Sequence, residues 1–139
     1  MEYKIIGDSC CDFNREQLED RLHFQSVPLQ LEIGDYHIAD DAQFHQKDFL
    51  GRMRTSSVGA KTACPSPEEF KLAMNCDAEM IFVVTLSEHL SGSYQSAVLG
   101  KQLYEEEYGV DHKKILIIPS NSAAAGQYRL VVALSLIHI

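Results

Sequence analysis

The sequence predicts an α/β fold with a mostly parallel sheet and helices on both faces. Two uniformly apolar stretches, MIFVVTL (80–86) and KILIIP (114–119), are typical of strands buried on both faces. The stretch between them, from about Gly92 to Tyr108, has helical character, and Gly109 is a common type of helix stop. A strand, a helix and a second strand in this order indicate a parallel β-α-β unit. The whole chain is expected to follow the order β-α-β-β-α-α-β-α-β-α.

The first elements begin almost at the N-terminus. YKIIGDS (3–9) predicts a short buried strand that ends in Gly-Asp-Ser. NREQLEDRL (14–22) predicts a helix, because Asn14 and Gln17 have the spacing of a capping box.

The next stretch, residues 24–40, has β character with alternation in its middle. Pro28 is typical of an edge strand or a strand end. A turn at Gly34 is expected before a second short strand at 36–38. Residues 44–54 predict a helix, because their large apolar side chains recur near helical spacing.

A strong helix start lies in the middle of the chain. Residues 56–65 are expected to form a loop. Ser66 then has the properties of an N-cap, Pro67 suits the first helical position, and Glu69 completes a capping box. This helix is expected to run to about Cys76.

Composition limits the classes of function. The length of 139 residues fits one domain or one lobe of a larger protein. The net charge of −8, from 20 acidic and 12 basic residues, opposes a general role on nucleic acids or anionic membranes. No apolar run approaches the roughly 20 residues of a membrane span, and no secretory signal is visible, so a cytoplasmic location is expected. The four cysteines and six histidines lack zinc-ligand spacing, which predicts reduced thiols and no metal site.

Small polar segments follow the predicted strands or precede the predicted helices. In parallel α/β sheets, ligands bind where the carboxyl ends of strands lie beside helix N-termini. Hydroxyl groups and open amides at such a place can hold one carboxylate or phosphate. The sequence therefore predicts a site for one small anion, built from GDSCCD (7–12), KTACPSP (61–67), LSEHLSGS (86–93) and PSNSAAAG (119–126).

The common nucleotide-binding and hydrolase motifs are absent from the sequence, which contains no G-x-x-x-x-G-K-[ST], G-x-G-x-x-G or G-x-S-x-G. Taken one at a time, the candidate residues also fit structural roles. These alternatives are helix capping for Ser91 and Ser93, a loop or strand-end hydroxyl bonded to backbone for Thr62, a turn for Asp8 and Ser9, an exposed side chain for His89 and Lys61, and packing for Cys10 and Cys11.

In combination, ordered motifs up to about residue 133 resemble the DegV family of fatty-acid-binding proteins. KTACPSPEEF (61–70) is similar to the family's Lys-Thr-Ser-Gln-Pro-Ser-Pro motif, and LSEHLSGSYQSA (86–97) to its Ser-x-x-Leu-Ser-Gly-Thr-Tyr-x-x-Ala motif. IIGDSCCDF (5–13) resembles its strand followed by Asp-Ser, and VPLQLEIGDYHIAD (27–40) its Val-Pro-Leu segment. The chain departs from these motifs at Ala63-Cys64 in place of Ser-Gln, Ser93 in place of Thr, and Pro119-Ser120 in place of Asp-Ser.

The resemblance implies a carrier without catalytic residues, cofactor or metal. Such a protein binds one long-chain fatty acid between two lobes and presents its carboxylate to a separate fatty acid kinase, which is dihydroxyacetone-kinase-like. Thr62 and Ser91 would bind the carboxylate through their hydroxyl groups, and the amide of Gly92 would be a further donor. Residues expected near this site are Ser9, Ser93 and Ser120.

The resemblance also implies a second lobe, because the family's chains are about twice as long. Residues 1–133 are expected to form the N-terminal α/β lobe, with a loop leading into a helix of small residues over 120–133. The last residues, LSLIHI (134–139), match the translation of a common transposase sequencing adapter. We therefore expect a truncated chain with a non-native tail and no C-terminal lobe.

Two other functions remain open from the residues alone. Ser91 or Cys10 could act with His89 as the nucleophile and base of a small hydrolase or phosphotransferase, which requires a base within hydrogen-bond reach. The chain could also be a structural lobe without a ligand.

Overall fold

The computed structural model describes residues 2–11 and 23–138. The helix predicted over 14–22 lies outside the described residues. The elements in chain order are β1 (Tyr3–Asp8), β2 (Phe24–Val27), β3 (Gln30–Ile33), β4 (Tyr36–Ala39), α2 (Gln46–Thr55), β5 (Lys61–Ala63), α3 (Pro67–Met74), β6 (Met80–Thr85), α4 (Ser93–Tyr108), β7 (Lys114–Pro119) and α5 (Ala125–His138). Within these ranges, no helix combines the length and the apolar character that a bilayer crossing requires.

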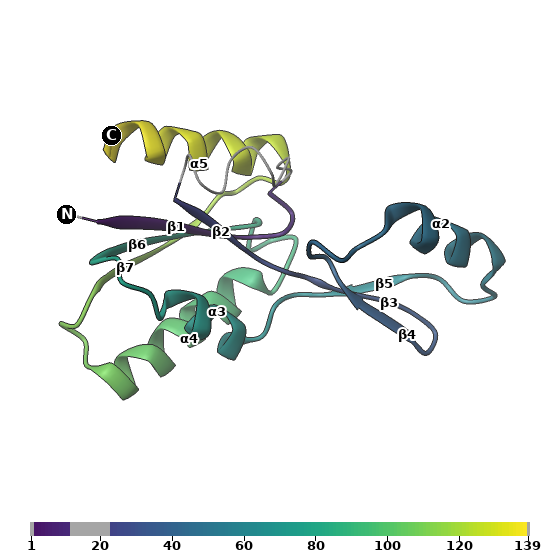
Figure 1. The fold of residues 1–139 in the computed structure, drawn as a ribbon, viewed down its shortest axis with the longest axis horizontal. Helices are drawn as coiled ribbons and strands as arrows, with labels where there is room; N and C mark the ends of the chain where they lie inside the picture. Colours follow the sequence, from purple (N-terminus) through teal and green to yellow (C-terminus); the bar gives the residue numbers. More distant parts are fainter. Residues whose placement is uncertain (1, 12–22, 139) are drawn as a thin grey trace.

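A parallel sheet with the strand order β2-β1-β6-β7 forms the body of the molecule. All three strand pairs are parallel, with Ile5 opposite both Phe24 and Phe82, and Phe82 opposite Leu116. Helices α3 and α4 cover one face of this sheet, and α5 covers the other (Figure 1). The predicted α/β class, a mostly parallel sheet with helices on both faces, is confirmed.

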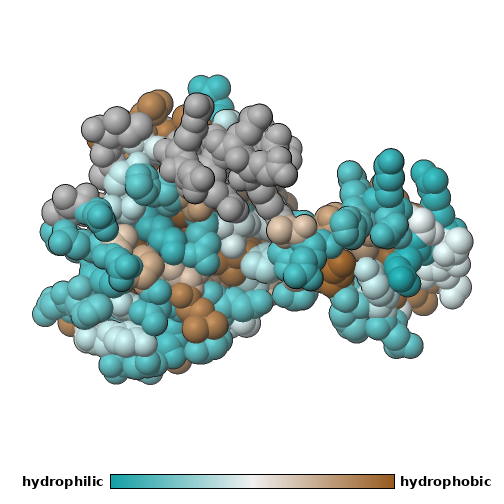
Figure 2. All heavy atoms as spheres, viewed as in Figure 1, coloured by the Kyte–Doolittle hydropathy of each residue, from teal (hydrophilic) through white to brown (hydrophobic). Residues whose placement is uncertain are grey.

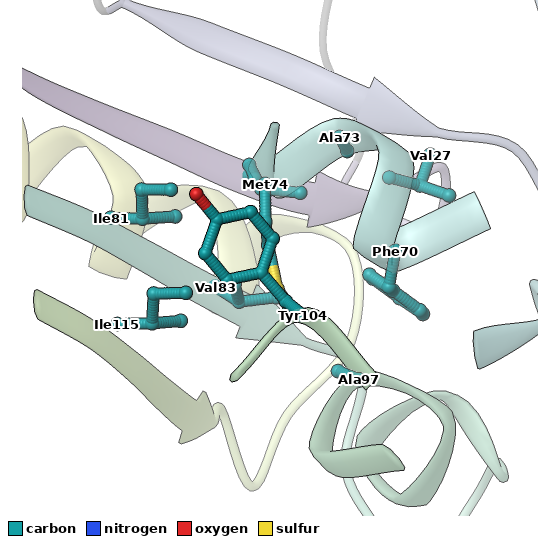
Figure 3. Close-up of a cluster of buried hydrophobic side chains, with 10 residues drawn as sticks. Val27, Phe70, Ala73, Met74, Ile81, Val83, Ala97, Tyr104 and Ile115 are labelled. Carbon is teal, nitrogen blue, oxygen red and sulfur yellow. The ribbon is translucent and has the colours of Figure 1, made fainter. Parts of the chain in front are cut away.

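Alternation along the central strands divides the core between the two faces. Ile81 and Val83 of β6 point toward α3 and α4, where Tyr104 is the largest fully buried side chain (Figure 3). Phe82 and Val84 point the other way, toward Val131 of α5. Strand β6 is therefore buried on both faces, which explains its uniformly apolar sequence. The same prediction is wrong for β7, which is an edge strand of the sheet with Leu116 exposed.

The second sheet is antiparallel, with the order β4-β3-β5. Together with α2 it forms an arm that extends from the body (Figures 1 and 2). Within the arm, the rings of Phe44 and Phe49 lie 5.5 Å apart, and the Arg52 guanidinium lies 4.0 Å from the centre of the Tyr36 ring. The first contact joins α2 to the loop before it, and the second holds α2 against β4.

The structure differs from the sequence-based prediction in this region. Residues 24–33 form two strands in different sheets, because the chain leaves the parallel sheet at Pro28 and Leu29. The predicted loop 56–65 is wrong for Lys61–Ala63, which pairs with β3 as β5.

The helices begin and end close to the positions that the sequence predicts. Ser66 caps α3 in a full capping box with Glu69, although α3 ends at Met74 and not at Cys76. Gly109 follows α4 with a φ of 95°, a backbone conformation that favours glycine. Helix α5 crosses residue 133 and ends at His138, and the non-native origin of 134–139 stays a prediction.

Candidate functional site

The first turn of α4 lies at the carboxyl end of the parallel sheet, as expected for a ligand site in this fold. We use the word cradle for residues 91–95, which enter and begin this helix. Gly92 is the N-cap and has no side chain to satisfy the helix amides. Within the described residues, the amides of Gly92, Tyr94 and Gln95 have no hydrogen-bond acceptor. They are therefore available to an anion.

Two serine hydroxyl groups lie side by side in the cradle. The Oγ atoms of Ser91 and Ser93 are 3.0 Å apart, and the Ser93 amide donates to Ser91 Oγ at 3.2 Å. Ser93 is fully buried, whereas Ser91 remains partly exposed. The predicted capping role is present for Ser91, which satisfies one helix amide, but not for Ser93, which is the first residue of the helix after the N-cap Gly92. Its exposed position also leaves it open to a ligand.

The segment that follows Thr62 runs against the cradle. Cys64 Sγ lies 3.7 Å from Ser96 Oγ, and a Cβ atom added to Gly92 would lie 3.1 Å from the same sulfur. An extended chain advances by at most about 3.6 Å per residue, so Thr62 lies within about 7 Å of Cys64 along β5. The structure thus brings the Thr62 segment to the start of α4. It records no direct contact between Thr62 and Ser91 within the described residues.

The side chain of Thr62 also lies in one row with two apolar side chains across the arm. It pairs with Leu31 of β3, which pairs in turn with Ile38 of β4. Directly opposed residues of antiparallel strands share a face, so the exposed Thr62 hydroxyl borders apolar surface. Lys61 lies on the opposite face, where its Nζ is 3.8 Å from Glu32 Oε1. The prediction that Lys61 is a solvent-exposed side chain is confirmed.

Asp8 is the residue whose importance the sequence did not reveal. Its side chain is fully buried, and it accepts hydrogen bonds from the Leu86 amide at 2.7 Å and from Gln127 Nε2 at 3.1 Å. The Cys10 amide bonds to the same carboxyl group at 3.2 Å. Burial raises the pKa of Asp8 above its usual 3.8, although the hydrogen bonds from Leu86, Gln127 and Cys10 oppose the shift. Asp8 therefore ties the ends of β1 and β6 to the first turn of α5.

Ser9 and Ser120 are bonded to nearby backbone. Ser9 Oγ accepts the Leu29 amide at 3.0 Å, which holds the chain where it leaves β2. Ser120 Oγ donates to the Ser122 carbonyl and accepts the Ser122 amide, at 3.0 and 3.1 Å. The turn role predicted for Ser9 is confirmed, while its closeness to a ligand and that of Ser120 stay predictions.

The geometry does not favour the hydrolase alternative. His89 is exposed, as predicted, and within the described residues its ring bonds neither to Ser91 nor to Cys10. Burial, with the nearby Asp8 and Asp40 carboxylates, raises the pKa of the Cys10 thiol to about 11, which opposes a thiolate nucleophile. The four cysteines are free thiols, as predicted. In residues 2–11 and 23–138, no three His, Cys, Asp or Glu side chains are grouped as a metal ion would require.

Comparison with protein families identifies what the chain resembles. A family model described as an uncharacterised protein of the DegV family matches residues 2–136. A DegV domain-containing protein of Streptococcus gordonii is 38% identical over 127 residues, which are 91% of this chain and 43% of that protein. Another, of Streptococcus pneumoniae, is 37% identical over 133 residues, which are 95% and 46%. The chain thus spans less than half the length of these two relatives.

Solved structures give the same likeness in three dimensions. A crystal structure of a DegV family protein from Ruminococcus gnavus with vaccenic acid has a TM-score of 0.91 and 44% identity, over 98% of this chain and 48% of that one. The fatty acid kinase (Fak) B3 protein of Streptococcus pneumoniae, loaded with linoleic acid, has a TM-score of 0.88 and 36% identity, over 99% and 48%.

Proposed function

The chain belongs to the DegV family, and on that basis we propose that it is the lobe of a carrier protein that holds the carboxylate of a long-chain fatty acid. The intact carrier would shield the acyl chain and present the carboxylate to a separate, dihydroxyacetone-kinase-like fatty acid kinase in the cytoplasm. Two structural relatives were crystallised with vaccenic and linoleic acid, which supports this ligand class.

The observation that carries the proposal is the meeting of two segments at the start of α4. Cys64 lies against Gly92 and Ser96, so the strand bearing Thr62 ends beside open amides and the Ser91 hydroxyl. Neutral donors converge there, and the helix N-terminus adds the equivalent of about half a positive charge. This arrangement suits one carboxylate better than a highly charged phosphate chain.

The surroundings of Thr62 suit the ligand's other end. Its neighbours across the arm, Leu31 and Ile38, are apolar and only partly buried. A ligand with a carboxylate at the cradle and a hydrocarbon tail along this row would satisfy both surfaces. A free phosphate or a small polar acid would contact only the cradle and not the apolar side chains.

In the proposed site, Thr62 and Ser91 donate their hydroxyl protons to the carboxylate, and the Gly92 amide adds a third hydrogen bond. Ser93, Ser9 and Ser120 hold the surrounding backbone. The chemistry of phosphorylation belongs to the kinase, because this lobe contributes binding and orientation.

A titration with decanoate, followed by the amide NMR signals of the chain, tests the proposal. Decanoate is a soluble acid of the same chemical class, and NMR detects weak binding. We expect shifts at residues 91–95 and at Thr62 with decanoate, and none at the cradle with decanol, which lacks the carboxylate. Equal shifts with both compounds, or none with either, would contradict the proposed site.

Single substitutions test whether the hydroxyl groups of Thr62 and Ser91 contact the ligand. Loss of a hydrogen bond to a charged group costs about 1.5–3 kcal/mol, so Thr62→Ala and Ser91→Ala should each weaken decanoate binding about ten- to hundredfold. Thr55→Ala is the matched control, because Thr55 lies in the arm and bonds to carbonyl groups of its own helix. If Thr62→Ala and Ser91→Ala both bind like the control, these residues are not the ligand contacts.

A further inference from the structure

Two short stretches of chain join the arm to the body, and Cys64 lies in one of them (Figure 1). Pro28 and Leu29 connect β2 with β3, and Cys64 and Pro65 connect β5 with the N-cap of α3. Proline fixes its own φ and restricts the residue before it to extended backbone. The connection through Cys64 and Pro65 is therefore stiff.

The thiol of Cys64 packs into the space that Gly92 leaves open. The φ of Gly92 is −74°, which lies outside the left-handed region that favours glycine. A Cβ atom at this position would lie only 3.1 Å from Cys64 Sγ, which is tighter than ordinary van der Waals contact. The same sulfur lies 3.7 Å from Ser96 Oγ, one turn further along α4. The close approach of Cys64, and not the backbone conformation, thus requires glycine here.

We propose that Cys64 is the positioning residue of the site: its side chain, packed against Gly92, sets the distance from Thr62 to the cradle. The inference rests on the proposed function, because it describes how the hydroxyl group of Thr62 is brought to the ligand. Cys64 acts through the backbone of β5 and is not itself a ligand contact.

The contact matters because Thr62 and the cradle belong to different parts of the fold. Thr62 is held in the arm by the pairing of β5 with β3, whereas the cradle belongs to the body. Side chains two apart on an extended chain lie on the same face, so the contact of Cys64 with Gly92 turns the face of Thr62 toward the cradle. A hydrogen bond from Gln30 Nε2 to Glu69 Oε1 also joins the arm to α3, but its length of 3.4 Å exceeds the usual range.

The test adds one methyl group to Gly92 in two backgrounds of the complete 139-residue chain. Gly92 is exposed, so the change does not disturb the core. Gly92→Ala places a Cβ atom against Cys64 Sγ, which should displace the strand of Thr62 and weaken decanoate binding about tenfold, within the range of coupling between residues in contact. In the Cys64→Ala background the sulfur is absent, and the same methyl group should change the affinity by less than about twofold. The lower preference for alanine at an N-cap is the same in both backgrounds and cancels.

A second measurement needs no ligand. Gly92→Ala should shift the amide NMR signal of Thr62, although the two residues are far apart in sequence. In the Cys64→Ala background, the same change should leave the Thr62 signal in place. Gly51→Ala is the matched control, because Gly51 lies in α2 and a Cβ atom there has no neighbour within 4 Å. It should alter neither the affinity for decanoate nor the Thr62 signal.

The comparison of the two backgrounds decides the inference. An affinity that Gly92→Ala leaves unchanged, or lowers equally in both backgrounds, would overturn it. A Thr62 signal that stays in place, or that moves equally in both backgrounds, would overturn it as well, because the effect would not pass through Cys64. Absence of decanoate binding to the unaltered chain would instead overturn the proposed function, and the Thr62 signal would still show whether Cys64 positions the strand.

Discussion

Replacing Gly100 by alanine tests the close packing of α3 against α4, which positions the cradle. A Cβ atom at Gly100 would lie 2.6 Å from the Pro67 carbonyl oxygen and 2.9 Å from Phe70 Cβ. Both atoms are held by the backbone of α3, so the helices must separate. Overpacking of this kind costs about 1–3 kcal/mol. Alanine regains about 0.5–1 kcal/mol of helix propensity, which leaves a net loss of about 1–2 kcal/mol in the free energy of unfolding.

Gly51→Ala is the matched control for the same chemical change. Gly51 lies within α2, and a Cβ atom there would have no neighbour within 4 Å. It should therefore stabilise the protein by about 0.5–1 kcal/mol. Urea unfolding followed by far-UV circular dichroism measures both values. If Gly100→Ala unfolds at the same urea concentration as the unaltered chain, or higher, the helix packing described here is wrong.

Two further predictions concern Ser66 and Asp8. Ser66→Ala removes the hydroxyl that accepts the Glu69 amide at 3.2 Å, and should cost about 1 kcal/mol in urea unfolding, whereas Ser66→Thr should retain most of the cap. Equal stability of these two variants would contradict the capping box. Burial raises the folded-state pKa of Asp8 above 3.8, so its stabilising contribution is complete below pH 3.8 and is lost as pH rises through the folded-state pKa. Relative to Asp8→Asn, the unaltered chain should lose stability across that range, and a constant difference between pH 3.5 and 8 would refute the shift.

The features that could be predicted from the sequence depend on neighbours along the chain. The uniform apolar character of β6 reflects burial on both faces, and it indicated a parallel sheet correctly. The capping box of Ser66 and Glu69 is likewise local, because three residues of spacing determine it.

The features that could not be predicted depend on distant partners. Lys61–Ala63 has no strand character of its own and becomes β5 because β3 offers it a free edge. Asp8 looked like a turn residue because two partners of its carboxyl group, Leu86 and Gln127, lie far away in sequence. A single charged residue at the end of an apolar strand was the one available signal for its burial.

The charges around the proposed site determine which groups could hold a carboxylate there. Within the described residues, no lysine or arginine hydrogen-bonds to Thr62, Ser91 or Ser93, and Lys61 pairs with Glu32 on the other face of the arm. A buried Asp8 carboxylate behind the cradle would add repulsion to a bound carboxylate. The helix N-terminus stabilises an anion by only about 0.3–1 kcal/mol at an exposed site. In the proposed site, the hydroxyl groups of Thr62 and Ser91 and the open amides of the cradle would therefore have to supply most of the binding energy for a carboxylate.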